Sequence, residues 1–371
     1  MNSMAIDRRR LIGGGAALLA CAPLALPLSG QAAARSRYVS AARGKDGNYQ
    51  IVFLSQDGVV ERTVPLSGRG HDIALSPDGR TAVAFARRPG TFGVAIDVAG
   101  RKAPEIFTAT AGHHFYGHGV FSTDGRLLYA TENVYDDARG VLGIYDIGAG
   151  YKRIGEYATH GVGPHEVLMM ADGVTLCVAN GGIETHPDAG RAKLNLDTMA
   201  PSVAFIDSRT GGLKSLHALS AGLHQLSLRH MCGDASGRVW FGGQWEGGVD
   251  DTPWLIGNVA IDRQIALAEP PAFSGKELKG YIGSMASSAD GRIVAASAPR
   301  AGRVLYFEAA SGRLVGEASI ADGCGVAPAG GERMALTSGE GIFEVSSPGA
   351  KVGHESRTEG ISFDNHLRRI A

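Results

Sequence analysis

The sequence predicts an all-β protein, a seven-bladed β-propeller. A histidine recurs ahead of a turn glycine, and the intervals from His71 to His118 and from His118 to His165 are both 47 residues. Each period has room for four strands, which is the size of one propeller blade. Helical periodicity is almost absent beyond the N-terminal segment. These observations together favour a closed ring of four-stranded sheets.

The repeating unit is a hairpin followed by two further strands. After His71, an apolar run leads to Ser76-Pro77-Asp78-Gly79 and then to a second run at residues 81–86. Asp-Gly between runs rich in β-branched and aromatic residues is the strongest short-range hairpin signal. The other hairpin turns lie at Asp124-Gly125, Asp172-Gly173, Ser236-Gly237 and Asp290-Gly291. Two more strands after each hairpin, such as 143–147 and 153–157, complete a blade.

The ends of the chain are expected to close the ring. Six innermost strands begin near His71, His118, His165, His230, Ser284 and Cys324. The first three strands, at residues 38–43, 49–54 and 59–65, lack a fourth, and residues 363–370 form an isolated candidate at the C-terminus. Pairing of the two ends would give seven blades and leave no free sheet edge. His366 would then head the innermost strand of the closing blade.

Composition agrees with one domain over residues 35–371. The chain has 54 glycines in 371 residues, about twice average usage, as expected when many strands need turns. No linker or low-complexity stretch divides the chain after the N-terminal segment. A propeller of this size is a single closed unit.

Residues 1–34 are expected to be an export signal outside the fold. Arg8-Arg9-Arg10 precedes an apolar, glycine-containing run, and Ala32-Ala33-Ala34 is a small-residue cleavage site. Paired arginines before such a run are typical of twin-arginine export, which predicts a periplasmic location. Two alternatives remain: an ordinary export signal that contains arginines, and lipid attachment at Cys21.

The charge of the chain limits which classes of partner are expected, and the cysteine count predicts a free thiol. Removal of residues 1–34 leaves 33 basic and 36 acidic residues without a basic cluster, which gives no reason to expect nucleic acid or an anionic membrane as partner. No transmembrane segment is expected in the mature chain. Three cysteines remain, Cys177, Cys232 and Cys324. An odd number in an oxidising compartment requires at least one free thiol or metal ligand.

The residues that head the innermost strands are the main functional candidates, because a propeller brings these positions together around one mouth of its channel. Imidazole, thioether and thiolate groups suit iron, copper or zinc. Glu166 and Asp72 could complete the ligand set or orient an imidazole. The alternative is that these histidines only form structural hydrogen bonds. The candidate metal ligands are His71, His118, His165, His230, His366, Glu166 and Cys324.

Other polar and sulfur-containing residues are candidates beside the mouth. Met285 lies near the heading position of the Ser284 strand, and Glu132 follows the second strand of its blade beside Asn133. The favoured interpretation of Glu132-Asn133 and of His113-His114 is solvated loop chemistry. The long segment 181–199 contains His186 and Lys193, and Gln244 lies at the corresponding end of the next blade. Loops on one propeller face are where binding residues usually collect.

Catalytic motifs are missing. The sequence contains no Gly-x-Ser-x-Gly elbow, no His-Glu-x-x-His, no phosphate loop and no Cys-x-x-Cys-His haem site. No catalytic residue is therefore assigned, and an enzyme is the less favoured interpretation.

Several motifs carry a resemblance to a known family. They include Gly163-Pro164-His165-Glu166, Thr185-His186-Pro187-Asp188, Arg229-His230-Met231, Gln244-Trp245-Glu246-Gly247 and the terminal Asp364-Asn365-His366. With the export signal, they resemble an uncharacterised family of twin-arginine-exported proteobacterial proteins of about this length, similar to WD40-like, YVTN-type and amine-dehydrogenase heavy-chain propellers. The resemblance implies a link to periplasmic iron acquisition, with imelysin-like and di-haem oxidoreductase-like proteins as partners.

Three hypotheses follow. The first is a periplasmic propeller that binds a transition metal, iron, copper or zinc, through the channel histidines and serves iron or copper acquisition. The second is a propeller scaffold without a metal that docks periplasmic redox or uptake partners through its loops. A lactonase-like hydrolase is a distant third.

Overall fold

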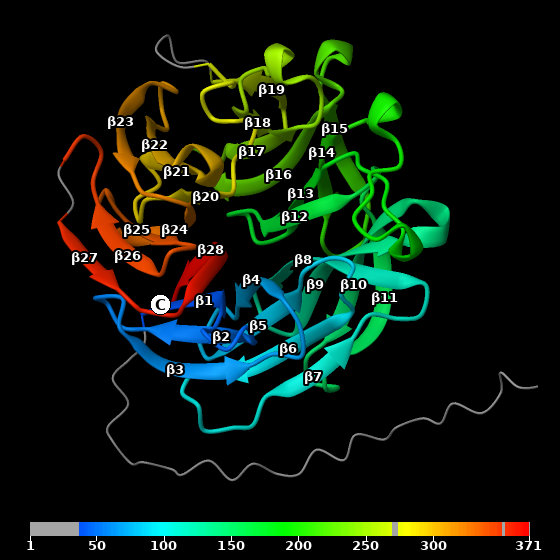
Figure 1. Cartoon of the computed structure of the whole chain (residues 1–371). Coiled ribbons are helices and arrows are strands. Elements are labelled where there is room, and N and C mark those ends of the chain that lie inside the picture. Colours follow the sequence, from blue (N-terminus) through cyan, green and yellow to red (C-terminus); the bar gives the residue numbers. More distant parts are fainter. Residues whose placement is uncertain (1–36, 269–273, 351–352, 371) are drawn as a thin grey trace, which may run out of the picture. The chain divides into compact units, whose positions relative to one another are not determined.

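The computed structural model describes residues 37–268, 274–350 and 353–370. These residues form seven four-stranded antiparallel sheets arranged around a central axis (Figure 1). The predicted seven-bladed β-propeller is confirmed. The expected export signal lies outside the described residues. Within the described residues, no helix has the length and apolar character needed to cross a membrane.

We number the blades I to VII and give their strands from the axis outward. Blade I contains β28 (Ser362–Arg369), β1 (Tyr38–Arg43), β2 (Tyr49–Leu54) and β3 (Val60–Pro65). Blade II contains β4 (Gly70–Leu75), β5 (Thr81–Ala86), β6 (Phe92–Asp97) and β7 (Glu105–Thr108). Blade III contains β8 (His113–Phe121), β9 (Leu127–Val134), β10 (Arg139–Asp146) and β11 (Lys152–Ala158). Blade IV contains β12 (Pro164–Met169), β13 (Thr175–Asn180), β14 (Ser202–Asp207) and β15 (Leu213–Ala218).

The remaining blades follow the same order. Blade V contains β16 (Leu226–Gly233), β17 (Val239–Trp245), β18 (Ile256–Ala260) and β19 (Arg263–Leu267). Blade VI contains β20 (Ser284–Ser287), β21 (Ile293–Ala298), β22 (Arg303–Glu308) and β23 (Leu314–Ser319). Blade VII contains β24 (Gly323–Gly330), β25 (Arg333–Ser338), β26 (Ile342–Ser346) and β27 (His354–Arg357). The helical elements described are single 3-10 turns: Tyr135–Asp137, Pro187–Ala189, Leu196–Thr198, Ala221–Leu223, Val249–Asp251 and Pro299–Ala301.

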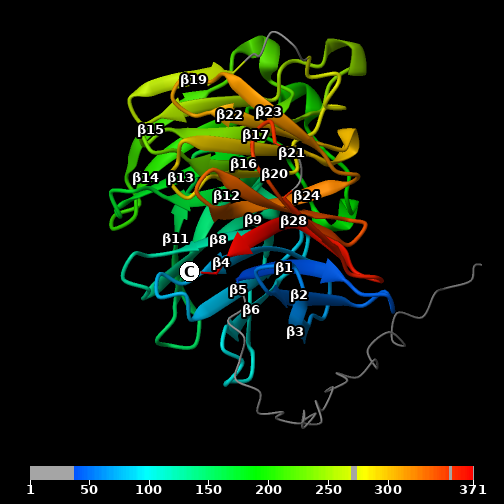
Figure 2. The same ribbon diagram turned by 90° about the vertical axis from the view of Figure 1, so that its left-hand side faces the viewer.

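The two ends of the chain close the ring as the sequence predicts. β28 pairs antiparallel with β1, from Tyr38 opposite Arg369 to Arg43 opposite Ser362. Both views show β28 directly beside β1 (Figures 1 and 2). Because the last strand pairs with β1, blade I has four strands like the other blades and the ring is closed.

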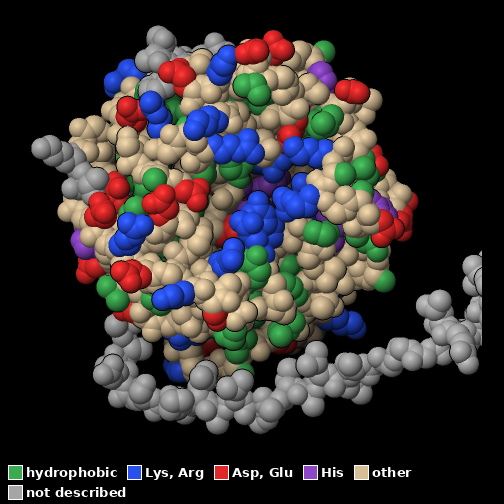
Figure 3. All heavy atoms as spheres, viewed as in Figure 1, with side chains coloured by type: hydrophobic (Ala, Val, Ile, Leu, Met, Phe, Trp, Pro, Cys, Tyr) green, Lys and Arg blue, Asp and Glu red, His purple; other side chains and the backbone are tan. Residues whose placement is uncertain are grey.

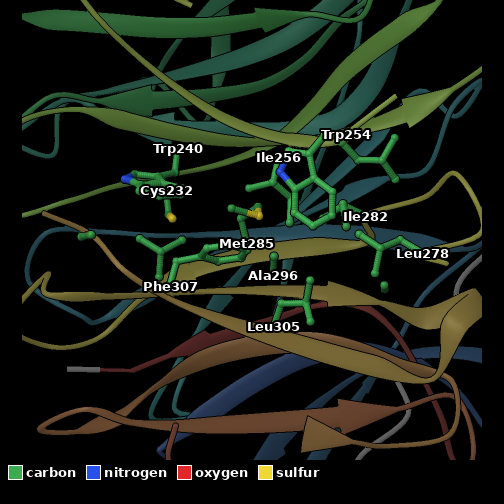
Figure 4. Packing of buried hydrophobic residues seen from close by; sticks show 14 of the residues in the cluster. Cys232, Trp240, Trp254, Ile256, Leu278, Ile282, Met285, Ala296, Leu305 and Phe307 are labelled. Atoms are coloured by element: carbon green, nitrogen blue, oxygen red, sulfur yellow. The ribbon is translucent and has the colours of Figure 1, made fainter. Parts of the chain in front are cut away.

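The hydrophobic core lies between neighbouring blades. Between blades V and VI, for example, Trp240 of β17 packs in one cluster with Leu305 and Phe307 of β22 (Figure 4). Such clusters recur around the ring. Apolar packing between blades therefore fixes the positions of the inner strands around the channel.

Candidate metal centre

Each of the five channel histidines lies at an irregularity of its inner strand. A β-bulge adds an unpaired residue and re-aims the neighbouring side chains. The register shifts are between Gly70 and Ile73 in β4, Phe115 and Gly119 in β8, Pro164 and Glu166 in β12, and Leu228 and His230 in β16. In blade I the shift lies between Ser40 and Ala42, opposite His366. We attribute the gathering of the imidazoles to these shifts.

The five imidazoles lie in contact with one another inside the channel. The ring centroids of His118 lie 4.8 Å from those of His71, His165 and His366. His230 completes the cluster, because its centroid lies 4.8 Å from both His165 and His366. Four of the rings are fully buried and that of His165 is half-buried. We call His71, His118, His165, His230 and His366 the ring histidines.

The donor atoms are close enough to hold an ion. One group comprises His71, His118 and His366, and a second comprises His118, His165 and His230, with donor atoms within 4.8 Å of one another in each. Two nitrogens bound to one tetrahedral ion lie about 3.3 Å apart, given bonds near 2 Å. A displacement on the order of 1 Å would therefore close either group on a metal. The expected convergence of at least three histidines is present, and His118 belongs to both groups.

Buried carboxylates contact the Nδ1 side of the imidazoles. Nδ1 of His118 lies 3.0 Å from Oδ2 of Asp72, and Nδ1 of His71 lies 3.3 Å from Oδ1 of Asp364. Nδ1 of His230 lies 3.7 Å from Oε2 of Glu166. A carboxylate hydrogen-bonded to one ring nitrogen, as at His118 and His71, fixes the tautomer and leaves the other nitrogen unprotonated and able to bind a metal, as in carboxylate–histidine–metal triads. The contact between His230 and Glu166 is too long for a hydrogen bond.

Five buried imidazole nitrogens have no hydrogen-bond partner among the described residues. They are Nε2 of His118 and of His366, Nδ1 of His165, and both ring nitrogens of His230. Buried polar atoms are nearly always satisfied, so several orphans at one point call for an explanation. Burial is the largest of the effects that lower the pKa of His71 to about 3 and the pKa of His230 to about 4. These imidazoles are therefore neutral at pH 7, the state that binds metals.

Arg368 holds the carboxylates in place. Its Nε donates to Oδ1 of Asp72 at 2.8 Å, and a terminal nitrogen donates to Oε1 of Glu166 at 2.9 Å. Oε2 of Glu166 also accepts the backbone N–H of Met231 at 2.9 Å. The Arg368 guanidinium helps to hold the pKa of Asp72 below its ordinary value, against the effect of burial. Asp72 and Glu166 therefore orient imidazoles, and together with His118 they form a third group of potential ligands.

One protein-family model matches most of the chain. Residues 64–370 match the family described as a protein of unknown function, DUF1513, and this span includes all five ring histidines. The chain belongs to the DUF1513 family. No curated protein matches the chain.

Solved structures similar to this DUF1513 protein share its fold. Hydrazine synthase of Kuenenia stuttgartiensis aligns with a TM-score of 0.59 at 14% identity, covering 90% of this chain and 99% of that one. The periplasmic gluconolactonase PpgL of Pseudomonas aeruginosa aligns with a TM-score of 0.59 at 16% identity, covering 91% and 99%. The β-propeller domain of Cps50 (Swd1) from Myceliophteria thermophila gives 0.55 at 14%, covering 82% and 94%. At these identities the likeness shows the fold alone.

Sequence reasoning missed Arg368 and Asp364 as parts of the centre. Both lie on β28 with His366, two residues to either side of it. Alternate residues of a strand face the same way, so the three side chains share one face. This spacing is visible in the sequence and could have identified both residues.

The structure does not bring Cys324 and Met285 to the ring histidines. Cys324 is in none of the described donor groups, and its thiol lies 3.5 Å from the backbone oxygens of Thr337 and Phe363. β24 has one register shift at Cys324 itself, between Gly323 and Gly325, and a second one between Pro328 and Gly330. An extra residue between Cys324 and the turn changes the side of the strand to which the cysteine side chain points, compared with the side that the spacing to the turn predicts. Burial also raises the pKa of this thiol. Met285 lies in the apolar cluster between blades V and VI (Figure 4).

The interpretation of Glu132 as solvated loop chemistry is wrong. Glu132 and Asn133 are buried in β9, paired with Phe115 and His114 of β8. Glu132 accepts hydrogen bonds from the Tyr145 hydroxyl at 2.5 Å and from Arg153 at 2.9 Å. Because the β8 and β9 strands extend beyond the expected hairpin, these residues form a buried structural network within blade III.

The long segment after β13 lies beside the channel mouth. His186 contacts Asp136 at 3.2 Å and accepts the N–H of Asp188, so it braces the loop. Lys193 forms an ion pair with Glu246 of blade V. Lys193 and Gln244 both line a cavity of about 430 Å³. The expected position of Lys193 and Gln244 at the rim is thus observed, whereas His186 does not line the cavity.

Proposed function

We propose that this chain is a periplasmic metal-binding propeller that holds a transition-metal ion on the ring histidines and serves iron or copper acquisition. One observation carries the proposal: buried imidazoles have unpaired nitrogens close to one another, while carboxylates hydrogen-bond the Nδ1 atoms of His118 and His71. A purely structural role would leave several buried nitrogens unsatisfied, which is costly.

The donor set selects the class of ion. Imidazole nitrogens suit copper, zinc, iron and nickel, and the affinity of such a site follows the order that peaks at copper(II). The thiol of Cys324 lies outside the donor groups, so the set lacks the soft ligand that favours copper(I). A divalent ion of this class is therefore the expected occupant.

Two further features support the periplasmic role. The arginine-containing N-terminal segment is typical of twin-arginine export, which carries folded proteins. The resemblance to exported proteins associated with imelysin-like and di-haem oxidoreductase-like proteins supports a place in metal uptake. In that role, the ion would be passed between this protein and an uptake partner.

The direct test compares the wild-type chain with a His118→Ala/His165→Ala variant. Both are purified from the periplasm, and metal content is measured by mass spectrometry, followed by calorimetric titration with Cu²⁺, Zn²⁺ and Fe²⁺. The wild type is expected to hold an ion in stoichiometric amount. The variant should lose it, because His118 belongs to both groups of histidines and His165 to one.

The matched control removes two histidines that lie outside the centre. His224 contacts the oxygen of Ala221, and His354 contacts that of Asp57. A His224→Ala/His354→Ala variant should keep its metal, and circular dichroism should show that both variants are folded. Stoichiometric metal in the His118→Ala/His165→Ala variant, or no metal in the wild type under any loading condition, would sink the proposal. Such results would favour a metal-free scaffold.

A further inference from the structure

Basic side chains surround the cavity at the mouth of the channel. Seven of its lining side chains are arginine or lysine, and Asp322 is the acidic one. Figure 3 shows Lys and Arg side chains gathered around a central hollow, with histidine visible between them. The whole chain is nearly neutral, with 36 basic and 37 acidic residues. The positive charge at this point is therefore local.

The neighbouring carboxylates do not neutralise this charge. Asp364 pairs with Arg69 and Arg87, and Glu246 pairs with Lys193 and Arg229, so two carboxylates serve four cations. Within the described part of the chain, Arg88, Arg191 and Arg300 have no carboxylate within 4 Å. At least three positive charges thus remain without a partner around one cavity.

The cations are also held in positions that are unfavourable for charge. Burial, then the charge of Arg229, lowers the pKa of Arg88 to about 10. Burial likewise lowers the pKa of Arg87 and Arg229. Nε of Arg229 is buried without a hydrogen-bond partner. Partly desolvated guanidinium groups with free donors interact strongly with any anion that reaches them.

The basic side chains that line the cavity come from different blades, which fix their positions. Arg87 and Arg88 follow β5, Arg229 lies in β16, and Arg300 lies in the turn after β21. The guanidinium of Arg300 lies over the ring of Tyr281, 4.9 Å from its centroid. Tyr281 also accepts a hydrogen bond from Asn365 of β28. A site built on strand ends and braced side chains is preorganised, so little ordering is needed on binding.

We propose that this cavity binds a small anion that carries two or more carboxylate or phosphate groups. Arginine presents paired N–H donors that match both kinds of oxyanion. A cavity of about 430 Å³ is within the usual size range for small-molecule sites. At least two charges are needed, because three cations lack partners. The ring histidines do not line this cavity, and Asp364 lies between the two sites because it contacts both His71 and the lining cations Arg69 and Arg87. We propose that the anion binds without the metal.

The test is calorimetric titration of the metal-free full mature chain in metal-free buffer, because citrate and pyrophosphate themselves chelate metal ions. Citrate and pyrophosphate represent the two kinds of oxyanion, and acetate at matched ionic strength represents a single charge. Citrate or pyrophosphate is expected to bind with micromolar affinity, and the tighter of the two identifies the natural chemistry. An Arg88→Gln variant should bind about tenfold more weakly or worse, the loss of one charged hydrogen bond.

Two controls separate this proposal from the metal site. Arg80→Gln removes an exposed arginine of a turn outside the cavity and should leave the affinity unchanged. The His118→Ala/His165→Ala variant should still bind the anion, and Arg88→Gln should still bind metal. The proposal is overturned if neither citrate nor pyrophosphate binds, if acetate binds as tightly, or if Arg88→Gln binds the anion as the wild type does.

Discussion

Two arcs of the ring use similar inner strands for different purposes. In blades I to V, the inner strands contribute the ring histidines, and these contact the carboxylates of Asp72, Glu166 and Asp364. In blades VI and VII, the equivalent strands contribute Met285 and Cys324, which pack in apolar clusters. The first arc concentrates polar groups in the channel, whereas the second adds to the hydrophobic core.

The difference arises from strand register as much as from residue type. β20 pairs with β21 without a register shift, and Met285 stays opposite Ala296 in the regular ladder. The five histidine-bearing strands are each irregular at or next to the histidine. β24 is irregular at Cys324 and again between Pro328 and Gly330. A bulge turns a side chain out of the ladder, and the channel carboxylates then hold it. A channel site therefore needs both the residue and the bulge.

The largest expected effect comes from removing Arg368, the cation that pairs with the carboxylates beside the ring histidines of blades I to V (the histidine arc). An Arg368→Met variant leaves Asp72 and Glu166 buried without their shared partner. Breaking such a pair should lower the free energy of unfolding by about 3 kcal/mol, a little less than for a fully buried pair because Arg368 is partly exposed. Urea denaturation of the metal-free protein measures it.

Arg369→Met is the matched control for Arg368. Arg369 is the next residue of β28. Its side chain is exposed and, within the described part of the chain, hydrogen-bonds the backbone oxygen of Pro328. This variant should change stability by less than about 0.5 kcal/mol. Equal losses for the two variants would mean that the centre does not depend on the Arg368 ion pairs.

Acid should destabilise the histidine arc next most strongly. Burial holds the pKa of His71 at about 3 and of His230 at about 4, against about 6.5 in an unfolded chain. The unfolded chain therefore takes up protons first, so this stability is complete above pH 6.5 and is lost as the pH falls toward 3. Each of these two histidines should lower the free energy of unfolding by about 2 kcal/mol between pH 7.5 and pH 5, measured by urea denaturation of the metal-free protein.

A His230→Gln variant checks the origin of this pH dependence. Glutamine cannot be protonated, so the curve of stability against pH should become less steep in the metal-free protein. An unchanged curve would assign the acid sensitivity to groups other than His230, such as His71 or the buried carboxylates.

The spacing of residues in the sequence was enough to predict the seven blades and the closure of the ring. It was not enough to predict which side chains point into the channel or line its mouth. The intervals between His71, His118 and His165 predict the blades, and residues 363–370 predict the closure. The bulge that turns Cys324 away has no clear signal, because it depends on pairing with β25. The basic cavity was not predicted, because single arginines such as Arg88 and Arg300 are unremarkable until closure places them around one mouth.

A smaller effect is expected at the glycine that makes room for a ring histidine. Gly117 has φ +109°, and a Cβ there would lie 2.7 Å from Cδ2 of His71. Gly112 has φ +80° with nothing within 4 Å of such a Cβ. Both substitutions by alanine cost the strain of a positive φ, but Gly117→Ala also displaces the imidazole. It should be less stable than Gly112→Ala by about 1 kcal/mol and bind metal more weakly, measured by thermal unfolding and titration. Equal behaviour would show that the position of His71 is not constrained.

The smallest effect is expected in the other arc. Cys324→Ser keeps a donor for the backbone oxygens of Thr337 and Phe363, and it replaces a weakly polar sulfur in an apolar cluster with a hydroxyl. The cost should be about 1 kcal/mol, and metal content should equal that of the wild type, because Cys324 belongs to none of the described donor groups. Thermal unfolding and mass spectrometry of the same preparation measure both quantities. If the variant loses its metal, the thiol must turn toward the ring histidines on binding, and the division between the two arcs would hold only for the metal-free protein.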